Sequence, residues 1–267
     1  MNRLSKAICI FLVTILLFSL TACSAGERHG RFRILKSYET KQLAIGFRND
    51  DIVRYYVMAA LQASAADGTV HNNALHWFGH DPVSIPADKE AMAKIKTVPK
   101  RTLIVGVDID AFPMAYKERD QFRGFDVDLA RDVCYRLGWK IEFIPIKAEN
   151  AYVELSSGNI DVAWGGLALD IGSKQYTTVF PYMEQGLVLV VRDDNRFRSV
   201  RKLKGATLAM DSGQYFLDII NADEDLRDRL GAIQRMQGGA RACFQSLDTA
   251  KVDCILVYKS ALWHFAK

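Results

Sequence analysis

The chain after residue 102 alternates short apolar segments with segments that have the hydrophobic spacing of a helix. For example, Val127, Ala130, Val133 and Leu137 recur every three or four residues, as on one face of a helix. The apolar segments that we expect to form strands are 103–107, 139–143, 160–164, 186–192, 207–210, 232–236 and 254–257. Such alternation is typical of α/β proteins with mostly parallel sheets. Because two such units are joined by the strand 186–192, we expect two lobes.

The first residues resemble a bacterial lipoprotein signal. Arg3 and Lys6 precede an apolar run at 7–20, and the sequence LTAC ending at Cys23 resembles a lipobox. The run is shorter than the ~20 residues of a membrane-spanning helix. We therefore predict a signal peptide at 1–22, lipidation of Cys23 and a tether at 23–30. The alternative is an uncleaved N-terminal anchor.

Composition excludes some classes of function. Cleavage after residue 22 leaves 245 residues, and the loss of Arg3 and Lys6 lowers the formal charge from +4 to +2. That charge is too small to indicate nucleic-acid binding. The chain contains no phosphate-binding loop, zinc-protease or dinucleotide motif, so we expect no cofactor and no metal. We expect Cys134, Cys243 and Cys254 to be buried thiols, although a bridge between Cys243 and Cys254 stays open.

Two stretches of this sequence resemble the family-3 solute-binding proteins, the extracytoplasmic amino-acid receptors of ABC importers. The stretch 103–138, LIVGVDIDAFPMAYKERDQFRGFDVDLARDVCYRLG, resembles the opening of that family. The stretch 42–79, with an apolar strand at 43–47 and a helix at 51–66, resembles its closing strand and helices. Because the closing segment comes first, we interpret the chain as a circular permutant. The resemblance covers nearly all of 30–80 and 102–267.

The resemblance implies an α/β, periplasmic-binding-protein-like fold, with two lobes joined by two crossover strands. We assign the first lobe to 42–79 plus 102–192 and the second lobe to 31–41 plus 193–267. A linker at 80–101 would join the old end to the old start, with a surface helix at 87–95. The crossovers near 190–194 and 36–42 are the expected hinges. A tandem array that lost half of each copy is the alternative to permutation.

Candidate ligand-binding residues follow the expected strands, because ligands of two-lobed α/β proteins bind at the carboxyl ends of strands. Selected by position alone, they are Asp108, Asp110, Phe112, Gly166, Ala168, Asp170, Asp211, Ser212, Gln214, Tyr215 and Tyr258. Glycines let a ligand approach backbone amides, and a helix that begins at Gln214 offers free donors to an anion. Alternatively, the acids cap turns and the aromatic rings pack in the core.

The resemblance also implies a clamp for an amino-acid ligand. Relatives usually hold the ligand carboxylate with an arginine, which suits it because two parallel hydrogen bonds form. They usually hold the ligand ammonium with an acid. Here Ser173 occupies the place of the arginine, Lys174 is the nearest cation, and Tyr258 occupies the place of the acid. We therefore include Ser173 in the candidate site and expect a cationic or other non-zwitterionic polar solute, with an amino acid as the alternative.

These observations predict a lipid-anchored, extracytoplasmic receptor on a bacterial cell membrane. It would be monomeric, close its lobes on a small polar solute and present it to an ABC permease, without enzymatic activity. One alternative is a degenerate receptor that binds a protein partner or no ligand. The other is a dehydratase-like enzyme that uses the cleft acids for general acid–base chemistry.

Overall fold

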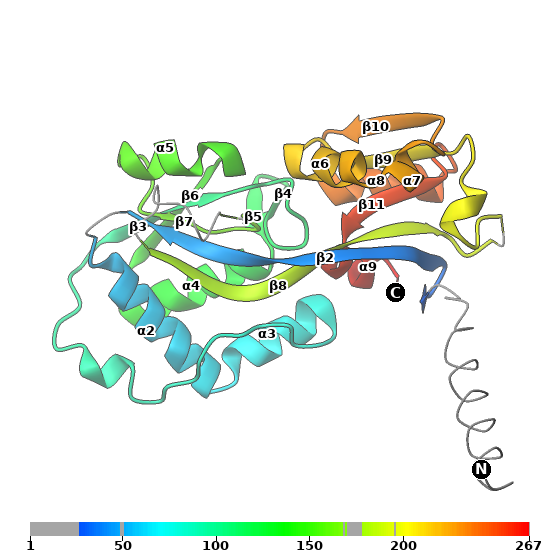
Figure 1. Cartoon of the computed structure of the whole chain (residues 1–267). Helices are drawn as coiled ribbons and strands as arrows, with labels where there is room; N and C mark the ends of the chain where they lie inside the picture. The colour runs from blue at the N-terminus through cyan, green and yellow to red at the C-terminus, as the bar shows by residue number, and fades with distance from the viewer. Residues whose placement is uncertain (1–26, 49–50, 168, 170–177, 195, 267) are drawn as a thin grey trace, which may run out of the picture.

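Two long antiparallel strands, β2 (Phe32–Phe47) and β8 (Thr178–Arg192), run through the middle of the molecule (Figure 1). The computed structural model describes residues 27–48, 51–167, 169, 178–194 and 196–266. One lobe lies toward the left end of these two strands in Figure 1 and the other toward their right end, each with its own parallel strands and helices. The strands therefore form the connection between the two lobes.

The described strands form one main sheet in the order β10-β9-β11-β8-β2-β7-β3-β6. In the first lobe, β3 (Thr102–Val107) is parallel to β6 (Lys140–Pro145) and to β7 (Val162–Ala163). In the second lobe, β9 (Thr207–Asp211) is parallel to β10 (Ala232–Met236) and to β11 (Cys254–Tyr258). The short β1 (Arg28–His29) pairs with β2, and β4 (Tyr116–Glu118) forms a hairpin with β5 (Gln121–Arg123). The predicted α/β fold with parallel sheets is confirmed.

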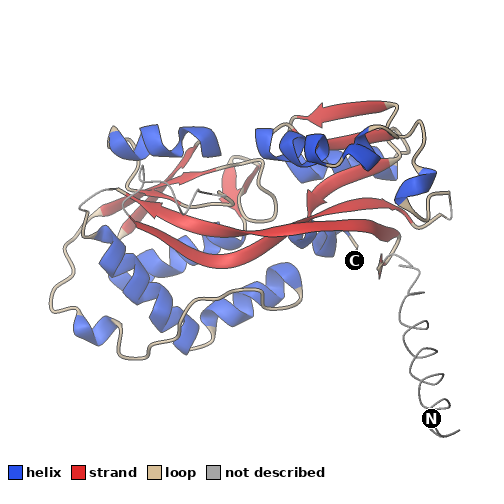
Figure 2. Cartoon of the chain, in the orientation of Figure 1, coloured by secondary structure: helices blue, strands red, loops and turns tan. Residues whose placement is uncertain are grey.

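Helices cover both lobes (Figure 2). In the first lobe, α2 (Val53–Ala66), α3 (Thr69–Phe78) and α4 (Phe125–Leu137) lie below the sheet in the view of Figure 1, and α5 (Ala151–Ser156) lies above it. The second lobe carries α6 (Gln214–Ala222), α7 (Glu224–Arg227), α8 (Gly239–Asp248) and α9 (Lys259–Phe265). Three single turns are η1 (Met92–Lys94), η2 (Ala148–Asn150) and η3 (Val200–Lys202).

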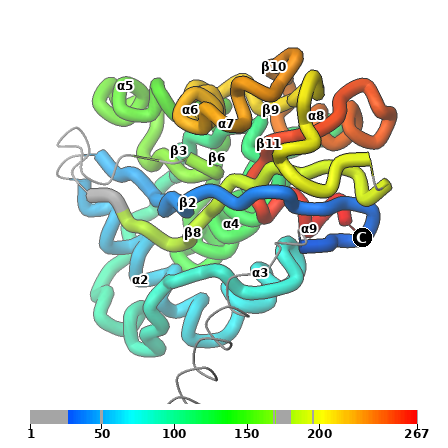
Figure 3. The backbone as a smooth tube through the Cα atoms, turned by 45° about the vertical axis from the view of Figure 1, so that its right-hand side comes forward, coloured from blue at the N-terminus to red at the C-terminus, as the bar shows by residue number. Residues whose placement is uncertain are grey.

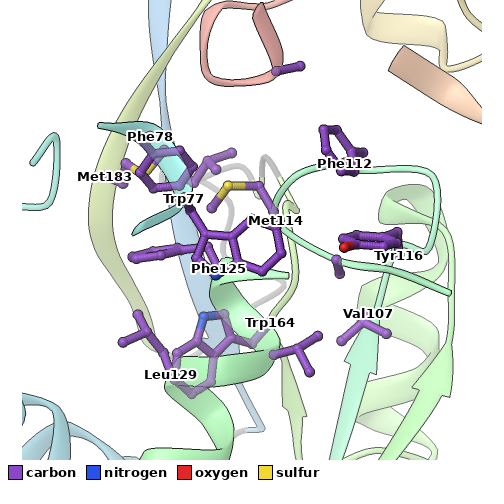
Figure 4. Close-up of a cluster of buried hydrophobic side chains, with 14 of the residues drawn as sticks. Trp77, Phe78, Val107, Phe112, Met114, Tyr116, Phe125, Leu129, Trp164 and Met183 are labelled. Carbon is purple, nitrogen blue, oxygen red and sulfur yellow. The ribbon is translucent and has the colours of Figure 1, made fainter. Parts of the chain in front are cut away.

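The core of the first lobe draws on segments from both sides of residue 102. Trp77 and Phe78 of α3 are buried in one cluster with Phe125 and Leu129 of α4 and with Trp164 (Figure 4). The predicted apolar face of α4 is buried, and the helix ends at Gly138, as expected of a left-handed C-terminal glycine. Residues before the linker thus share a core with residues after it.

Strand β2 is longer than the sequence indicated. Most of the second-lobe segment 31–41, the crossover expected near 36–42 and the strand expected at 43–47 form one strand of 16 residues. Its beginning pairs with β8, which in turn pairs with β11, and its end pairs with β7, the neighbour of β3. The expected strand at 186–192 likewise begins earlier, at Thr178, because it pairs with β2 along its length.

The structure also tests the expected helix in the linker and the expected state of the cysteines. The surface helix expected at 87–95 is wrong, since only η1 forms there. Within the described linker only Ala91 is buried, so a helix at 87–95 would have no apolar face to pack against the protein, and such a short helix is unstable.

Cys134, Cys243 and Cys254 are buried free thiols, as expected, and Cys243 and Cys254 do not form a disulfide bond. Burial raises the pKa of each thiol to about 12.

The two ends of the described chain lie close together. Ala266, which follows α9, lies against Gly30 just before β2, and the red and blue segments meet there in Figure 3. Within the described part of the chain, no helix combines the length and the apolar character that spanning a membrane requires.

Candidate functional site

A cavity of about 340 Å³ lies between the two lobes, at the carboxyl ends of β3, β9 and β11. Its walls contain nine of the residues selected from the sequence: Asp108, Asp110, Phe112, Gly166, Asp211, Ser212, Gln214, Tyr215 and Tyr258. The first four belong to the first lobe and the others to the second lobe. Ala168, Asp170 and Ser173 lie outside the described residues, as do Lys174 and Cys23.

The cavity has this location because parallel strands end at the same edge of a sheet. Strand β3 leads into Asp108, β9 ends at Asp211 and β11 ends at Tyr258. Gly166 completes the wall of the first lobe with φ +71, and a Cβ atom there would clash with Ala111. A residue with a side chain would therefore strain the backbone here and displace Ala111 or the loop itself.

Lys147 is a charged residue of the site that the sequence analysis did not select. Its Nζ lies 2.6 Å from Asp110 Oδ2 and 3.2 Å from Asp108 Oδ1. Lys147 follows β6, so the rule that selected the residues after β3 would also have found it. Burial raises the pKa of Asp108, and the amide of Asp110 and the ammonium of Lys147 oppose this rise.

Asp211 faces these acids from the second lobe. Its Oδ1 accepts a hydrogen bond from the Gly213 amide at 2.8 Å. Burial, together with the negative charges of Asp108 and Asp110, raises the pKa of Asp211 to about 6. The lobes approach closely here, because a Cβ atom on Gly239 would clash with the carbonyl oxygen of Asp110 and lie 2.9 Å from Asp211 Oδ2. Acids of both lobes thus converge on one space.

Aromatic rings form the wall opposite the acids of the first lobe. The rings of Phe216 and Tyr258 are 5.3 Å apart, and Tyr215 lies beside Phe216. Burial raises the pKa of the Tyr258 phenol well above its ordinary value, so this residue is neutral at physiological pH. Lys41 Nζ lies 3.7 Å from the centre of the Tyr215 ring, which shows that this ring accepts a cation.

The charged groups in the described lining are mostly acidic. They comprise the carboxylates of Asp108, Asp110, Glu149 and Asp211 and the cations of Lys147 and Arg235. Arg235 is exposed and donates a hydrogen bond from Nη2 to the carbonyl oxygen of Ser212. Within the described residues, no group of three acids, histidines or cysteines is arranged to hold a metal ion.

A buried carboxyl group supports the wall from behind. Asp126 Oδ2 accepts hydrogen bonds from the Tyr182 hydroxyl at 2.6 Å and from the Gly166 amide at 2.7 Å. Burial raises the pKa of Asp126 to about 7, and these hydrogen bonds oppose the rise. Asp126 is not among the residues selected from the sequence, and it holds Gly166 in place without lining the cavity.

Comparisons with known proteins agree with this geometry. The model of the bacterial extracellular solute-binding proteins, family 3, matches residues 103–236, which is half of the chain. The probable amino-acid-binding protein YxeM of Bacillus subtilis is 28% identical over 139 residues, 51% of this chain and 53% of that protein. The L-cystine-binding protein TcyJ of Escherichia coli is 26% identical over 186 residues, 68% of this chain and 67% of that protein.

The arginine-binding extracellular protein ArtP of Bacillus subtilis is 30% identical over 115 residues, 43% of this chain and 45% of that protein. The chain thus matches about half the length of YxeM and ArtP. Among solved structures, an ancestral cationic amino acid solute-binding protein is similar, with a TM-score of 0.51 and 26% identity. That match covers 62% of this chain and 73% of the ancestral protein.

Proposed function

Because this chain belongs to family 3 of the bacterial extracellular solute-binding proteins, we propose that it is the receptor of an ABC importer. It would close its two lobes on a small polar solute and present that solute to a permease. The observation that carries this proposal is the cavity between the lobes, whose walls come from both. The strands β2 and β8 connect the lobes and are the hinge in this proposal.

The ligand class follows from the relatives and from the cavity. Relatives are named for binding arginine and L-cystine, so an amino acid or a cationic amine is the proposed ligand. The proposed ligand-binding residues are the nine that line the cavity, together with Ala168, Asp170 and Ser173. We propose a binding protein that acts as a monomer, without catalysis, in agreement with relatives that are named as binding proteins.

We propose that the receptor is anchored outside the cytoplasm by a lipid on Cys23, after removal of the signal peptide 1–22. The seven residues 24–30 that follow span at most about 25 Å, so the second lobe would lie close to the membrane. The variant Cys23→Ala should appear in the soluble fraction after cell fractionation. Full-length Cys23→Ala that stays in the membrane fraction would contradict the lipid anchor.

We also propose that the chain is a circular permutant, with the first lobe formed by 42–79 plus 102–192 and the second by 31–41 plus 193–267. The family match begins at residue 103, where the sequence resembles the opening of the family. In addition, α2 and α3 pack on α4, and β2 pairs in both lobes. The segment 80–101 is then the linker between the original ends.

A reordered chain tests the permutation. A protein that runs from Thr102 to Ala266 and continues directly at Gly30 to Pro82 keeps nearly every contact of the native order. It should therefore fold with the same far-UV circular dichroism and a similar melting temperature. A reordered chain that is unfolded or insoluble, while the native order is folded, would contradict the permutation.

A thermal-shift screen tests the receptor function. The detergent-solubilised full chain is heated with individual amino acids, amines and short peptides. A solute at a hundred times its dissociation constant stabilises the folded state by about 2.7 kcal/mol, which is a measurable shift. We expect at least one solute to stabilise the protein. If none does, the chain is a degenerate receptor, which the pairing of Lys147 with acids inside the cavity favours as the second candidate.

A further inference from the structure

We infer that the cavity between the lobes takes an organic cation that lacks a carboxylate, and that Lys147 competes with this ligand for the acids Asp108 and Asp110. The inference rests on the proposed receptor function and specifies its ligand class. The support is that some charged groups of the cavity already form ion pairs within the protein, whereas others have no partner of opposite charge among the described residues.

Asp211, the acid of the second lobe in the described lining, lacks a cationic partner. Asp211 accepts the Gly213 amide through Oδ1, and no described lysine or arginine forms an ion pair with it. Asp211 also faces Asp108 and Asp110 across the cavity, so three negative charges approach one another with one ammonium between them. A ligand cation in this space would relieve that repulsion and complete the pairing of Asp211.

A ligand carboxylate, in contrast, would find no unpaired cation in the buried part of the described lining. Of the two cations in the described lining, Lys147 is paired with Asp108 and Asp110. The other, Arg235, donates one hydrogen bond to the Ser212 carbonyl and is exposed, so it can meet a carboxylate only at the solvent side of the cavity. The amino end of α6 attracts anions in principle, but the carboxylate of Asp211 already accepts its first amide, that of Gly213. A zwitterionic ligand would therefore bury an incompletely paired carboxylate among acids.

The aromatic wall suits a cation as well. Tyr215, Phe216 and Tyr258 all line the cavity, and the faces of such rings attract ammonium and guanidinium groups. Lys41 already approaches the Tyr215 ring at 3.7 Å, although Lys41 itself is not part of the lining. The rings thus supply attraction for a positive charge without requiring a negative partner.

Lys147 gives this site its selectivity. Its side chain is 42% exposed, so its ammonium can move into solvent when another cation takes its place. An ammonium is a point charge on a flexible stem, whereas a guanidinium donates two parallel hydrogen bonds to a carboxylate. A guanidinium ligand is therefore the better competitor against Lys147.

Agmatine and arginine test the ligand class, because agmatine is arginine without its carboxylate. Isothermal titration calorimetry of each probe with the detergent-solubilised full chain measures the effect of that single group. We expect agmatine to bind at least ten-fold more tightly than arginine, a difference of about 1.4 kcal/mol. Arginine that binds as tightly as agmatine, or more tightly, would overturn the inference. Stabilisation by calcium chloride with no effect of agmatine would overturn it too.

The variant Lys147→Met tests the competition. It removes the internal ammonium, so agmatine should bind several-fold more tightly than to the wild type. Lys94→Met is the matched control, since Lys94 makes an ion pair of 2.6 Å with Asp88 in the linker, away from the cavity. It should leave both affinities unchanged. If Lys147 instead holds a ligand carboxylate, Lys147→Met weakens arginine binding, and the inference fails.

Asp211→Asn provides a second readout that does not depend on the folding of the Lys147 variant. Loss of this carboxylate should weaken agmatine binding at least ten-fold, and an unchanged affinity would overturn the inference. If neither probe binds while another solute stabilises the protein in the thermal-shift screen, the inference fails and the receptor function stands. If no solute stabilises the protein, the receptor function itself fails.

Discussion

Gly30 lies against Ala266, so closely that a Cβ atom on Gly30 would clash with the carbonyl oxygen of Ala266. One residue precedes β2 and the other follows α9, so the described chain almost closes on itself. A direct peptide connection at this point would join the second lobe to β2. This is the connection that the proposed circular permutation removed.

The Gly30 contact predicts a measurable cost of an added methyl group. Gly30→Ala and Gly138→Ala both place a Cβ atom at positive φ, +56 and +66, which costs roughly 1–2 kcal/mol at either position. Gly138 has open space around it, whereas Gly30 meets Ala266. Gly30→Ala should therefore destabilise the protein by roughly 1 kcal/mol more in urea denaturation. Equal costs would show that the two ends do not touch in solution.

Asp126 predicts how stability changes with pH. Its folded-state pKa is raised to about 7 by burial, whereas an unfolded aspartate titrates near a pKa of about 3.9. The folded state therefore binds this proton more strongly, and its contribution to stability is complete below pH 4 and lost as the pH rises to about 7. Asp126→Asn should flatten this decline in urea denaturation measured between pH 4 and 7.

The control for this prediction is Asp228→Asn, because the Asp228 side chain is 71% exposed. It should leave the slope of stability against pH unchanged. A steep decline that survives in Asp126→Asn would assign the titration to another group.

Arg241 of the second lobe contacts the first lobe, so we expect its removal to weaken lobe closure. The residue lies on α8 of the second lobe, and its guanidinium carbon is 4.5 Å from the centre of the Tyr116 ring in the first lobe. Its Nη2 also lies 3.7 Å from Glu118 Oε1. A cation–π contact contributes roughly 0.5–1 kcal/mol at an exposed site, so Arg241→Met should weaken solute binding by about two- to five-fold. Calorimetry with a solute from the screen measures this change.

Arg131→Met is the matched variant, since Arg131 lies 5.5 Å from the centre of the Phe143 ring within the first lobe. It removes a cation–π contact that closure does not form, and solute affinity should stay constant. The same loss of affinity in both variants would mean that Arg241 does not connect the lobes.

The raised pKa of Asp211 leads us to expect that cation binding depends on pH. Burial and the charges of Asp108 and Asp110 raise its pKa to about 6, and a bound cation stabilises the ionised form. Agmatine affinity should therefore increase as the pH rises from 5 to 7. In Asp211→Asn this increase should become smaller, because only Asp108, whose pKa is also raised by burial, remains to contribute, and calorimetry at several pH values measures both. An affinity that is constant with pH in the wild type would contradict this assignment.

The sequence predicted helix α4 and the positions of the strands along the chain better than the lengths of the strands. The face of α4 repeats at helical spacing, so local periodicity was sufficient to place it. The length of β2 depends on its pairing with β8, from Phe32↔Arg192 to Phe47↔Thr178. The exposed polar residues in the middle of β2 resemble a connection, and only a tertiary partner makes them a strand.

The site was predictable in position and less so in chemistry. Because the carboxyl ends of parallel strands meet at one edge of a sheet, we could predict from the sequence that Asp108, Asp211 and Tyr258, from three separate segments, share one site, and all three line the cavity. The ion pairs of Lys147 were not predictable, since a lysine after a strand usually points into solvent. The raised pKa of Asp211 arises from burial and from acids of the other lobe, which only the folded chain brings near.

The decisive experiment is a crystal structure of the protein with a solute that the screen identifies. We expect the solute in the cavity between the lobes, in contact with Asp108 or Asp110 of the first lobe and with Asp211 of the second. A solute that contacts one lobe only, or that binds in the groove lined by β2, β8 and α9, would contradict this expectation.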